Sequence, residues 1–241
     1  ASANDDVALL FTSGTTGTPK AVRLTADNVA AAAAAHRDRF GAEPDDRWLC
    51  CLPMGHTGGL APVFRSAVYG TALVVQRRFD ARVTPTVLDE HGITGVSLVP
   101  TMLDRLLDAD WTPPETLDTV LLGGAPARSD LLSRAFEADV PVYPTYGTTE
   151  TASQIATATP EQARQYSGTV GNPLLGTAVT IVDEETPVES GSTGEIVVDG
   201  PTVCAGYLDE ATTAAAFGEY GLHTGDLGYR DEDGQIGRAH V

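Results

Sequence analysis

The sequence predicts an α/β fold, in which a mostly parallel sheet with helices on both faces is followed by a smaller, mainly antiparallel β subdomain. Short apolar runs alternate with helical segments over the first two thirds of the chain, a pattern typical of parallel sheets. The last third holds short β runs separated by turn-rich sequence. The 241 residues, 42% of them hydrophobic, are enough to bury a core. We therefore expect an α/β unit over residues 1–168 and a small β unit over residues 169–241.

The elements of the first unit are predicted from apolar runs and from the residues that end them. A continuous apolar run at 7–11 predicts a buried strand. Thr25 is a suitable N-cap for a helix, and Thr101 is a suitable N-cap for another. Proline ends two of the strand-like runs, at Pro53 and Pro100. The remaining strands are expected at 48–52, 72–76, 96–99, 120–122 and 142–146, and the helices at 26–40, 83–91, 101–108 and 129–138.

The second unit is predicted to be built mainly from antiparallel strands. Short β runs lie at 178–182 and 195–198, with turn-rich sequence between them, and a short helix is expected at 209–217. Residues 228–236 are expected to form a hairpin, because Asp233-Gly234 is a strong signal for a tight turn. This change in pattern is the reason for the boundary near residue 168.

The charge balance is strongly acidic. The chain has 15 Lys and Arg against 33 Asp and Glu, a formal net charge of −18. Such a surface repels phosphate backbones, so we expect no nucleic-acid partner. Lys20 is the one lysine, and the other basic residues are arginines. An acidic, lysine-poor surface indicates a halophilic source, because high salt screens its self-repulsion; an acidic protein from a GC-rich genome is the alternative.

Membrane and disulfide signals are weak in this sequence. No apolar run approaches the ~18 residues that a membrane span needs, and no signal peptide opens the chain, so we expect no membrane partner. The three cysteines, two of them adjacent at Cys50 and Cys51, have neither a disulfide nor a zinc spacing. Buried, reduced thiols in a cytoplasmic protein are therefore expected.

A loop rich in glycine and hydroxyl groups follows the first predicted strand and ends at Lys20. Its glycines let the backbone approach a ligand closely, its hydroxyls donate hydrogen bonds, and the lysine supplies a cation for phosphate oxygens. No Ser or Thr follows the lysine, so this is not a Walker A loop. A polar surface turn is the alternative. The candidate phosphate-binding residues are Thr12, Ser13, Gly14, Thr15, Thr16, Gly17 and Lys20.

At this loop the chain resembles the adenylate-forming superfamily, which includes acyl-CoA synthetases, luciferases and peptide-synthetase adenylation domains. The loop departs from the family signature only in that Ala21 replaces the glycine after the lysine. Three further stretches resemble family motifs and occur in the family's order: Leu-Gly-Gly-Ala-Pro at 122–126, Tyr-Gly-Thr-Thr-Glu at 146–150 and Thr-Gly-Asp at 224–226. Their joint occurrence is much more specific than any one of them.

The resemblance implies roles for the motif residues toward ATP, Mg²⁺ and coenzyme A, the last as co-substrate. Lys20, Thr149 and Glu150 would act on the phosphates, with Glu150 as the Mg²⁺ ligand. Tyr146 would stack on adenine, and Asp226 would bind the ribose hydroxyls. Taken singly, Tyr146 also fits a core position, Glu150 a charge at a helix start and Asp226 a turn. The other expected nucleotide contacts are Gly123, Gly124, Ala125, Pro126, Gly147 and Thr148.

The acid to be activated is predicted from four stretches of the sequence. Residues 52–60 resemble the family segment beside the acyl pocket, where His56 would face the substrate carboxylate; helix capping is its alternative role. Residues 99–103, 121–126 and 145–154 resemble the subfamily of ligases for o-succinylbenzoate, an aromatic keto-diacid of menaquinone synthesis. Ser153 and Gln154 are the candidates for its second carboxylate and ketone, unless they cap local structure. A general medium- or long-chain acyl-CoA synthetase remains an alternative.

The resemblance also implies what lies outside this chain. Family members are longer at both ends, so an upstream subdomain and a C-terminal lid are expected to be missing, with weak or no turnover. Sheet edges would then be exposed, and a homo-oligomer or a partner chain is expected to cover them. Arg238 is left unassigned, because it follows Asp226 too closely. A non-catalytic adenylate-binding module is the second hypothesis; amino-acid-activating domains fit less well, since no aspartate is placed in the acyl pocket.

Overall fold

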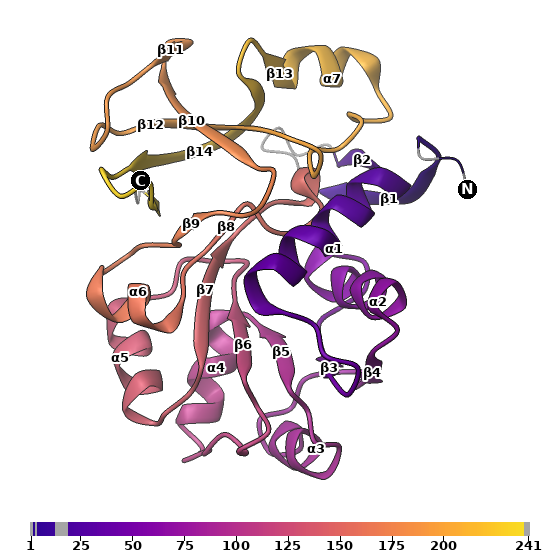
Figure 1. Ribbon diagram of the computed structural model, residues 1–241, viewed down its shortest axis with the longest axis vertical. Coiled ribbons are helices and arrows are strands. Elements are labelled where there is room, and N and C mark those ends of the chain that lie inside the picture. Colours follow the sequence, from indigo (N-terminus) through magenta and orange to yellow (C-terminus); the bar gives the residue numbers. More distant parts are fainter. Residues whose placement is uncertain (1, 3, 13–18, 239–241) are drawn as a thin grey trace.

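The computed structural model describes residues 2, 4–12 and 19–238 of the chain (Figure 1). A seven-stranded mixed sheet forms the lower part of the molecule in Figure 1, in the order β4-β3-β5-β6-β7-β8-β9. The strands from β4 to β7 are parallel, and β8 and β9 add antiparallel pairs. These strands are β3 (Arg47–Cys50), β4 (Ala72–Val75), β5 (Gly95–Leu98), β6 (Thr119–Leu122), β7 (Val142–Tyr146), β8 (Ala156–Thr157) and β9 (Asn172–Pro173).

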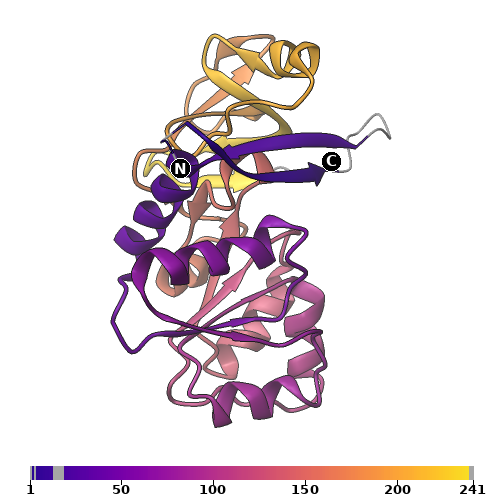
Figure 2. The same ribbon diagram turned by 90° about the vertical axis from the view of Figure 1, so that its right-hand side faces the viewer.

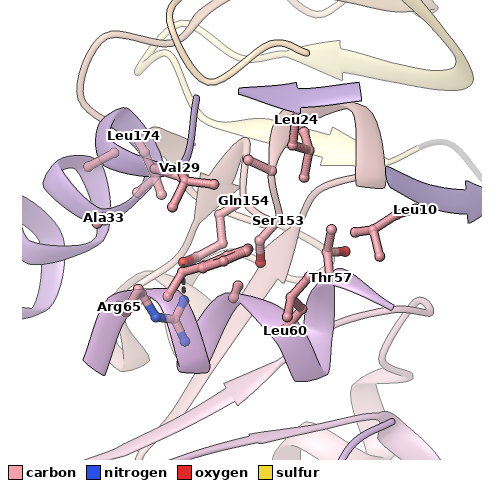
Figure 3. A pocket seen from close by; sticks show the side chains of 15 residues that line it. Leu10, Leu24, Val29, Ala33, Thr57, Leu60, Arg65, Ser153, Gln154 and Leu174 are labelled. Atoms are coloured by element: carbon pink, nitrogen blue, oxygen red, sulfur yellow. Dashed lines mark hydrogen bonds between the residues drawn. The ribbon is translucent and has the colours of Figure 1, made fainter. Parts of the chain in front are cut away.

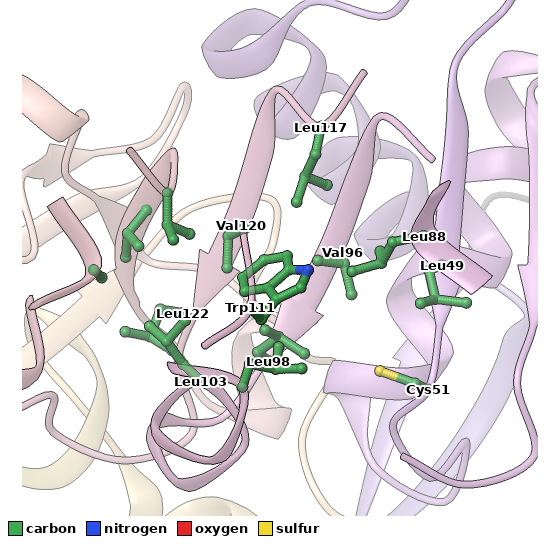
Figure 4. Packing of buried hydrophobic residues seen from close by; sticks show 14 of the residues in the cluster. Leu49, Cys51, Leu88, Val96, Leu98, Leu103, Trp111, Leu117, Val120 and Leu122 are labelled. Atoms are coloured by element: carbon green, nitrogen blue, oxygen red, sulfur yellow. The ribbon is translucent and has the colours of Figure 1, made fainter. Parts of the chain in front are cut away.

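Three helices cover one face of this sheet and enclose the largest hydrophobic core (Figure 4). They are α3 (Thr84–Glu90), α4 (Pro100–Leu107) and α5 (Ser129–Glu137). Leu98 of β5 and Leu122 of β6 point from the sheet toward these helices. Leu103 of α4 packs against both leucines. All three side chains are almost wholly buried. Burying one leucine side chain stabilises the fold by roughly 2 kcal/mol. The packing on this face therefore holds the three helices against the sheet. The short α6 (Pro160–Gln165) packs beside β7 and α5.

The opposite face of the sheet carries α1 (Ala26–Phe40) and α2 (Thr57–Tyr69). Side chains alternate along a strand, so the neighbours of the core leucines point to this side. On this second face lie Trp48 of β3, Ser97 of β5 and Leu121 of β6, together with Gly95 of β5. A Cβ added to Gly95 would lie 2.4 Å from the ring carbons of Trp48, so the glycine makes room for that ring. Small and polar residues on this face leave space for cavities.

A second, antiparallel sheet forms the upper part of the molecule in Figure 1, as the sequence predicts. Its order is β11-β10-β12-β14-β13, with β15 paired to β14. Gly234, at φ +78°, makes the expected turn between β14 and β15. The elements are β10 (Ala178–Asp183), β11 (Thr186–Pro187), β12 (Gly194–Asp199), α7 (Glu210–Ala216), β13 (Phe217–Gly218), β14 (Gly221–Arg230) and β15 (Ile236–Arg238).

The first two strands form a separate antiparallel hairpin, β1 (Asp6–Thr12) and β2 (Lys20–Thr25), which lies between the two sheets in Figure 2. The expectation of a buried strand at 7–11 is wrong. Leu9 is 49% exposed and Phe11 63%, and only Leu10 is buried. A two-stranded ribbon has one face to bury, whereas the prediction assumed a central strand covered on both. A bridge from Val22 to Tyr207 ties the hairpin to the upper part.

The long first helix is confirmed, and its cap also connects distant parts of the chain. Thr25 and Asn28 form a reciprocal capping box at the start of α1. The Asn28 Nδ2 also donates to the carbonyl oxygens of Pro201 and Val203, at 2.9 and 2.7 Å. One amide side chain therefore closes the helix and holds the loop that follows β12.

Two expectations about helices are corrected. The helix α2 was not predicted, because Gly58, Gly59 and Pro62 are unusual in a helix. Gly59 is required there, since a Cβ would lie 2.4 Å from the Pro53 carbonyl oxygen. The N-cap of α4 is Val99, two residues before the expected Thr101 cap, and Pro100 is the first helical residue. None of the helices in the described ranges has the length and apolar character to cross a membrane.

Candidate functional site

A cavity of about 540 Å³ opens at the carboxyl ends of the parallel strands. Ligands of open α/β sheets bind at this edge. Residues from three stretches that are far apart in the sequence meet here, and each stretch directly follows a strand. The predicted site residues that line the cavity are His56, Gly123, Gly124, Gly147, Thr148, Thr149 and Ser153.

His56 lies in the connection between β3 and α2, at the N-cap position of that helix. Its side chain makes no capping hydrogen bond to the described residues, and it is exposed at the cavity. The capping alternative is therefore not what the structure shows. The imidazole is free to meet a ligand.

The loop after β7 is folded tightly against itself. A Cβ on Gly147 would lie 1.7 Å from the Ser153 carbonyl oxygen, so only glycine fits this crossing. The 3₁₀ turn η1 (Thr149–Thr151) follows, with Thr148 and Thr151 bound to one another. Ser153 has φ +131°, a conformation that costs energy for a residue with a Cβ. The loop thereby holds Thr149 and Ser153 in the cavity wall.

The two glycines after β6 also lie in the cavity wall, and for a structural reason. A Cβ on Gly123 would lie 2.7 Å from Thr145 Cγ2, and Gly124 has φ +79°. Ala125 and Pro126, which were also predicted to contact the nucleotide, are exposed in the connection to α5 and do not line the cavity. The backbone of the glycine pair is thus the part of this motif that faces the cavity.

Tyr146, Asp226 and Arg238 form a hydrogen-bonded group beside the cavity. The Tyr146 hydroxyl donates to Asp226 Oδ2 at 2.9 Å, and Arg238 donates to Asp226 Oδ1 at 2.9 Å. The guanidinium lies 5.1 Å from the centroid of the Tyr146 ring. Burial, with the Asp226 charge in addition, raises the pKa of Tyr146, so its hydroxyl stays protonated. The stacking of adenine on this ring stays a prediction.

Arg238 was left unassigned in the sequence because of its short spacing from Asp226. The hairpin explains the spacing: β14 and β15 pair Gly228 with Arg238, so the chain turns back and brings Arg238 to the aspartate. The Asp233-Gly234 turn was visible in the sequence. Counting residues outward from that two-residue turn would have placed Arg238 opposite Tyr229, one residue from its observed partner Gly228 and close to Asp226.

Glu150 and Lys20 are connected through Tyr207, a residue that the sequence did not single out. The Tyr207 hydroxyl donates to Glu150 Oε1 at 2.9 Å, and Lys20 Nζ lies 5.4 Å from the centroid of its ring. Burial and the Glu150 charge raise the pKa of Tyr207. Thr12 pairs with Lys20 across the β1–β2 hairpin. The expected phosphate-loop residues Ser13, Gly14, Thr15, Thr16 and Gly17 lie outside the described residues.

Gln154 does not line the cavity. Its side chain lies in a neighbouring, mostly apolar pocket and points to a buried arginine (Figure 3). Arg65, on α2, donates to Gln154 Oε1 at 3.2 Å, and His36 Nδ1 lies 2.9 Å from the same oxygen. Arg65 is 6% exposed, lies over the Trp48 ring at 4.8 Å and has no carboxylate partner among the described residues. Burial lowers its pKa to about 10, so it remains a cation at neutral pH.

Arg65 lines the cavity together with Ser153, although no sequence motif indicated this arginine. A buried guanidinium without a counter-ion is costly unless something pairs with it. A lone arginine inside an unpredicted helix has no motif around it. A carboxylate in the cavity would supply the missing charge, and that makes Arg65 a candidate ligand-binding residue.

The described residues contain no group of three or more His, Cys, Asp or Glu side chains placed to hold a metal ion. Mg²⁺ does not need such a group where phosphates are present, because it is held by one or two carboxylates, phosphate oxygens and waters. Glu150 receives a hydrogen bond from Tyr207 on Oε1, which leaves Oε2 available. This single oriented carboxylate fits a Mg²⁺ ion that arrives with a nucleotide.

The fold, with a cavity at the carboxyl ends of its parallel strands, defines an α/β ligand-binding domain, and the comparisons with known proteins identify its family. Residues 1–208 match the AMP-binding enzyme family, and the chain belongs to that family. It is similar to the 2-succinylbenzoate–CoA ligase of Bacillus pumilus, with 41% identity over 232 residues. That match covers 96% of this chain and 48% of the relative. The chain spans about half the length of the curated relatives it matches.

Solved structures give the same result in three dimensions. The o-succinylbenzoate CoA synthetase of Bacillus subtilis, in complex with its acyl-adenylate intermediate, has a TM-score of 0.95 at 38% identity, covering 98% of this chain and 49% of that one. The same enzyme with ATP and a magnesium ion has a TM-score of 0.94. A putative long-chain fatty-acid CoA ligase from Rhodopseudomonas palustris has a TM-score of 0.88 at 28% identity, covering 99% and 60%.

Proposed function

We propose that this chain is the nucleotide- and acid-binding core of an ATP-dependent acid–CoA ligase, and that its acid is o-succinylbenzoate. The observation that carries the proposal is the cavity in which His56 and the loop 147–149 face a buried arginine, Arg65, that has no carboxylate partner among the described residues. A diacid can use one carboxylate for chemistry and the other for this arginine. The relatives that act on 2-succinylbenzoate support the choice.

The proposed reaction has two steps. The substrate carboxylate attacks the α-phosphate of ATP, which forms an acyl-adenylate and releases pyrophosphate. The thiol of coenzyme A then attacks the acyl carbon and releases AMP. Both steps need positioning and charge stabilisation, and neither needs a nucleophilic side chain.

Each part of the site has a proposed task in the first step. Thr149 hydrogen-bonds the α-phosphate, and Lys20 neutralises phosphate charge. Asp226, held by Tyr146 and Arg238, binds the ribose hydroxyls. His56 faces the reacting carboxylate. Glu150 would hold Mg²⁺, which offsets the charge of the triphosphate when bound.

The distal half of the substrate explains the polar residues of the cavity wall. We assign the second carboxylate to Arg65, which Gln154 holds by a hydrogen bond, and the ketone to Ser153. Gln154 thus acts through Arg65, although the sequence alone had placed it against the substrate. A buried cation is a poor neighbour for a fatty acyl chain, which disfavours the general acyl-CoA synthetase.

Calorimetric titration with non-hydrolysable acyl-adenylate analogues tests the proposal, in molar KCl with Mg²⁺. Binding measures the site of this chain directly and does not require turnover. We expect the o-succinylbenzoyl analogue to bind more tightly than a dodecanoyl analogue, and Arg65→Met to weaken the first by about tenfold or more. Glu150→Gln is expected to weaken Mg²⁺-dependent ATP binding. Asp130→Asn, in an exposed ion pair with Arg128, is the matched control.

The outcomes separate the hypotheses. A preference for the dodecanoyl analogue would favour a general acyl-CoA synthetase. Binding of both analogues to the chain, without product formation when it is combined with the rest of its parent protein, would favour a non-catalytic adenylate-binding module. Binding of neither analogue would contradict the proposed site.

We further propose a halophilic source and a partner chain or second copy that covers exposed sheet edges. The net charge of −18 with a single lysine supports the first. The exposed apolar residues Leu9 and Phe11 on the hairpin support the second. A cytoplasmic location is supported by Cys50, Cys51 and Cys204, which are buried and unpaired among the described residues.

A further inference from the structure

A second cavity lies behind the acyl cavity, on the same face of the parallel sheet. Its volume is about 270 Å³, and it opens near the amino ends of the strands, where Thr94 precedes β5 and Thr119 begins β6. We call it the rear cavity. Its walls include aromatic and polar side chains from α1, α2 and β3, namely His36, Phe40, Trp48, Ser66 and Tyr69. Three acidic residues from the adjoining loops, Glu43, Asp46 and Asp118, line it as well.

Among the described residues, Arg65 is the one that lines both the acyl cavity and the rear cavity. The register of the sheet shows how close the two spaces are. Thr119 lines the rear cavity and Leu121 the acyl cavity, and they are two residues apart on β6. Two residues of a strand span roughly 6.6 Å. That is the reach of one long side chain.

The sheet itself offers little obstruction between the two spaces. On β5 the residues paired with Thr119 and Leu121 are Gly95 and Ser97, which are both small. The Trp48 ring covers Gly95, and the Arg65 guanidinium covers that ring. The separation of the two cavities is therefore made by side chains, with Arg65 stacked on Trp48.

Arg65 is positioned by few contacts. Its hydrogen bond to Gln154 Oε1 and its stacking on Trp48 are the contacts that orient the guanidinium. Its second terminal nitrogen, Nη2, and the Trp48 Nε1 are buried and have no hydrogen-bond partner among the described residues. The partition thus consists of two stacked side chains, and Arg65 is the one of them that lines both cavities.

We propose that Arg65 is the partition that sets the depth of the acyl cavity, and that the rear cavity is a continuation of it, separated by this side chain and able to hold the distal part of a longer carboxylic acid. This inference rests on the proposed function, because it takes the cavity beside His56 as the acyl site. Arg65 is then a specificity-determining residue in two ways. It binds a distal carboxylate at a fixed distance, and it excludes acids that extend further.

The test uses the whole chain and a series of linear acyl-adenylate analogues, from hexanoyl to tetradecanoyl, with binding measured by calorimetry. In the wild-type chain, affinity is expected to stop rising at the length that reaches Arg65. In Arg65→Ala, the chain length at which affinity stops rising (the length limit) is expected to increase. The longest analogues should bind this variant about tenfold more tightly than they bind the wild type, because additional methylenes are buried. Arg65→Met is the matched control, because it removes the charge and keeps most of the length.

A second variant checks where the extra chain goes. Adding Thr119→Phe to Arg65→Ala fills the rear cavity from β6, so the gain for long analogues should disappear. Thermal unfolding confirms that each variant is folded. The proposal is overturned if the limit does not move in Arg65→Ala, if Arg65→Met moves it equally, or if Thr119→Phe leaves the gain unchanged.

The o-succinylbenzoyl analogue separates this inference from the proposed function. If the wild type fails to bind that analogue while the length limit still shifts in Arg65→Ala, the assigned acid is wrong and the partition stands. If the wild type binds it tightly and the limit does not shift, the partition is wrong and the assigned acid stands.

Discussion

Asp226 shows how one carboxylate is held in place on the proposed nucleotide side of the site. Each of its oxygens has a different partner, Tyr146 on Oδ2 and Arg238 on Oδ1. The side chain cannot rotate without losing one of the two bonds. A ribose diol would therefore meet an acceptor whose direction is already fixed, which lowers the entropy cost of binding.

Replacing Asp226 with alanine should weaken ATP binding by about tenfold to a hundredfold. The variant loses the proposed hydrogen bonds from the two ribose hydroxyls, and the buried Tyr146 hydroxyl loses its acceptor. Isothermal titration with ATP and Mg²⁺ measures the loss. Asp130→Ala is the control, since its pair with Arg128 is exposed and contributes little. Equal affinities for Asp226→Ala and Asp130→Ala would contradict a role for Asp226 in the nucleotide site.

His36 predicts a pH dependence of stability. Burial, followed by the nearby Arg65 charge, lowers its pKa well below the usual value of 6.5. The unfolded chain binds a proton as the pH falls below about 6.5, while folded His36 stays neutral. The free energy of unfolding from this residue is thus fully present above that pH and decreases as the pH falls, by up to about 1.4 kcal/mol per unit.

His36→Gln keeps an N–H donor for Gln154 and removes the titration. Between pH 7 and pH 5, urea unfolding of this variant should lose about 1–2 kcal/mol less stability than the wild type. His91→Gln, at an exposed position, is expected to follow the wild-type curve. A parallel loss in His36→Gln and wild type would show that His36 is not the group responsible.

At the scale of elements, α1 is joined to the upper part of the molecule by its own cap. Asn28 accepts from the Thr25 backbone N–H and donates to two carbonyl oxygens of the loop 201–203. The capping box of α6 offers a comparison, because Gln162 has the same position in its box and donates to Asn172. The two side chains differ in their distant contacts: Asn28 donates to two backbone carbonyl oxygens, and Gln162 donates to one side-chain oxygen.

Asn28→Ala should therefore cost about 3 kcal/mol of unfolding free energy, and Gln162→Ala about 1 kcal/mol. The difference reflects the two part-buried carbonyl oxygens, of Pro201 and Val203, that lose their Asn28 donor. Chemical denaturation of the two variants and the wild type gives the comparison. Similar losses for both would mean that Asn28 acts as a cap alone.

Elements with a regular local pattern were predictable, and those defined by distant contacts were not. The helix α1 has a cap and a long alanine-rich run, and its bounds agree with the prediction. The helix α2 was missed, because glycine has a low helix propensity. Gly59 occurs in this helix because its backbone lies against the Pro53 carbonyl, where a Cβ would not fit. The apolar run at 7–11 was expected to be buried, but burial depends on how many strands lie beside it.

The site divides in the same way. Motif residues such as Glu150 and Asp226 could be found because their neighbours in the sequence identify them. Arg65 and Tyr207 have no such neighbours, and their importance comes from contacts made after folding, with Gln154 and Glu150. Gln154 was predicted to contact the second carboxylate or the ketone of the acid, but it does not line the cavity and its side chain accepts a hydrogen bond from Arg65.

At the scale of the whole molecule, the candidate site joins both sheets. His56 and the loops after β6 and β7 belong to the parallel sheet, whereas Asp226 and Arg238 come from the antiparallel one. Tyr207 precedes α7 and reaches Glu150 across this junction. Binding of a nucleotide would therefore stabilise the junction as well as the site.

The acidic surface gives a prediction for the whole chain. At a net charge of −18, repulsion between carboxylates opposes folding, and salt shortens its range from about 10 Å at 0.1 M to about 3 Å at 1 M. Urea midpoints should rise between 0.1 M and 2 M KCl. Sucrose at matched osmolality controls for general stabilisation by cosolutes. Midpoints that do not respond to KCl would contradict the proposed halophilic source.

Lys20 has a practical consequence for experiments on this chain. It is the one lysine of the 241 residues, and it lies on β2 over the Tyr207 ring. Reagents for primary amines therefore have two targets, Lys20 and the amino terminus of the chain. Their reaction rates can be compared in one sample by peptide mass spectrometry. A nucleotide that covers Lys20 should slow its acylation and leave the terminus as an internal standard, so occupancy can be followed without a mutation or a fluorescent analogue.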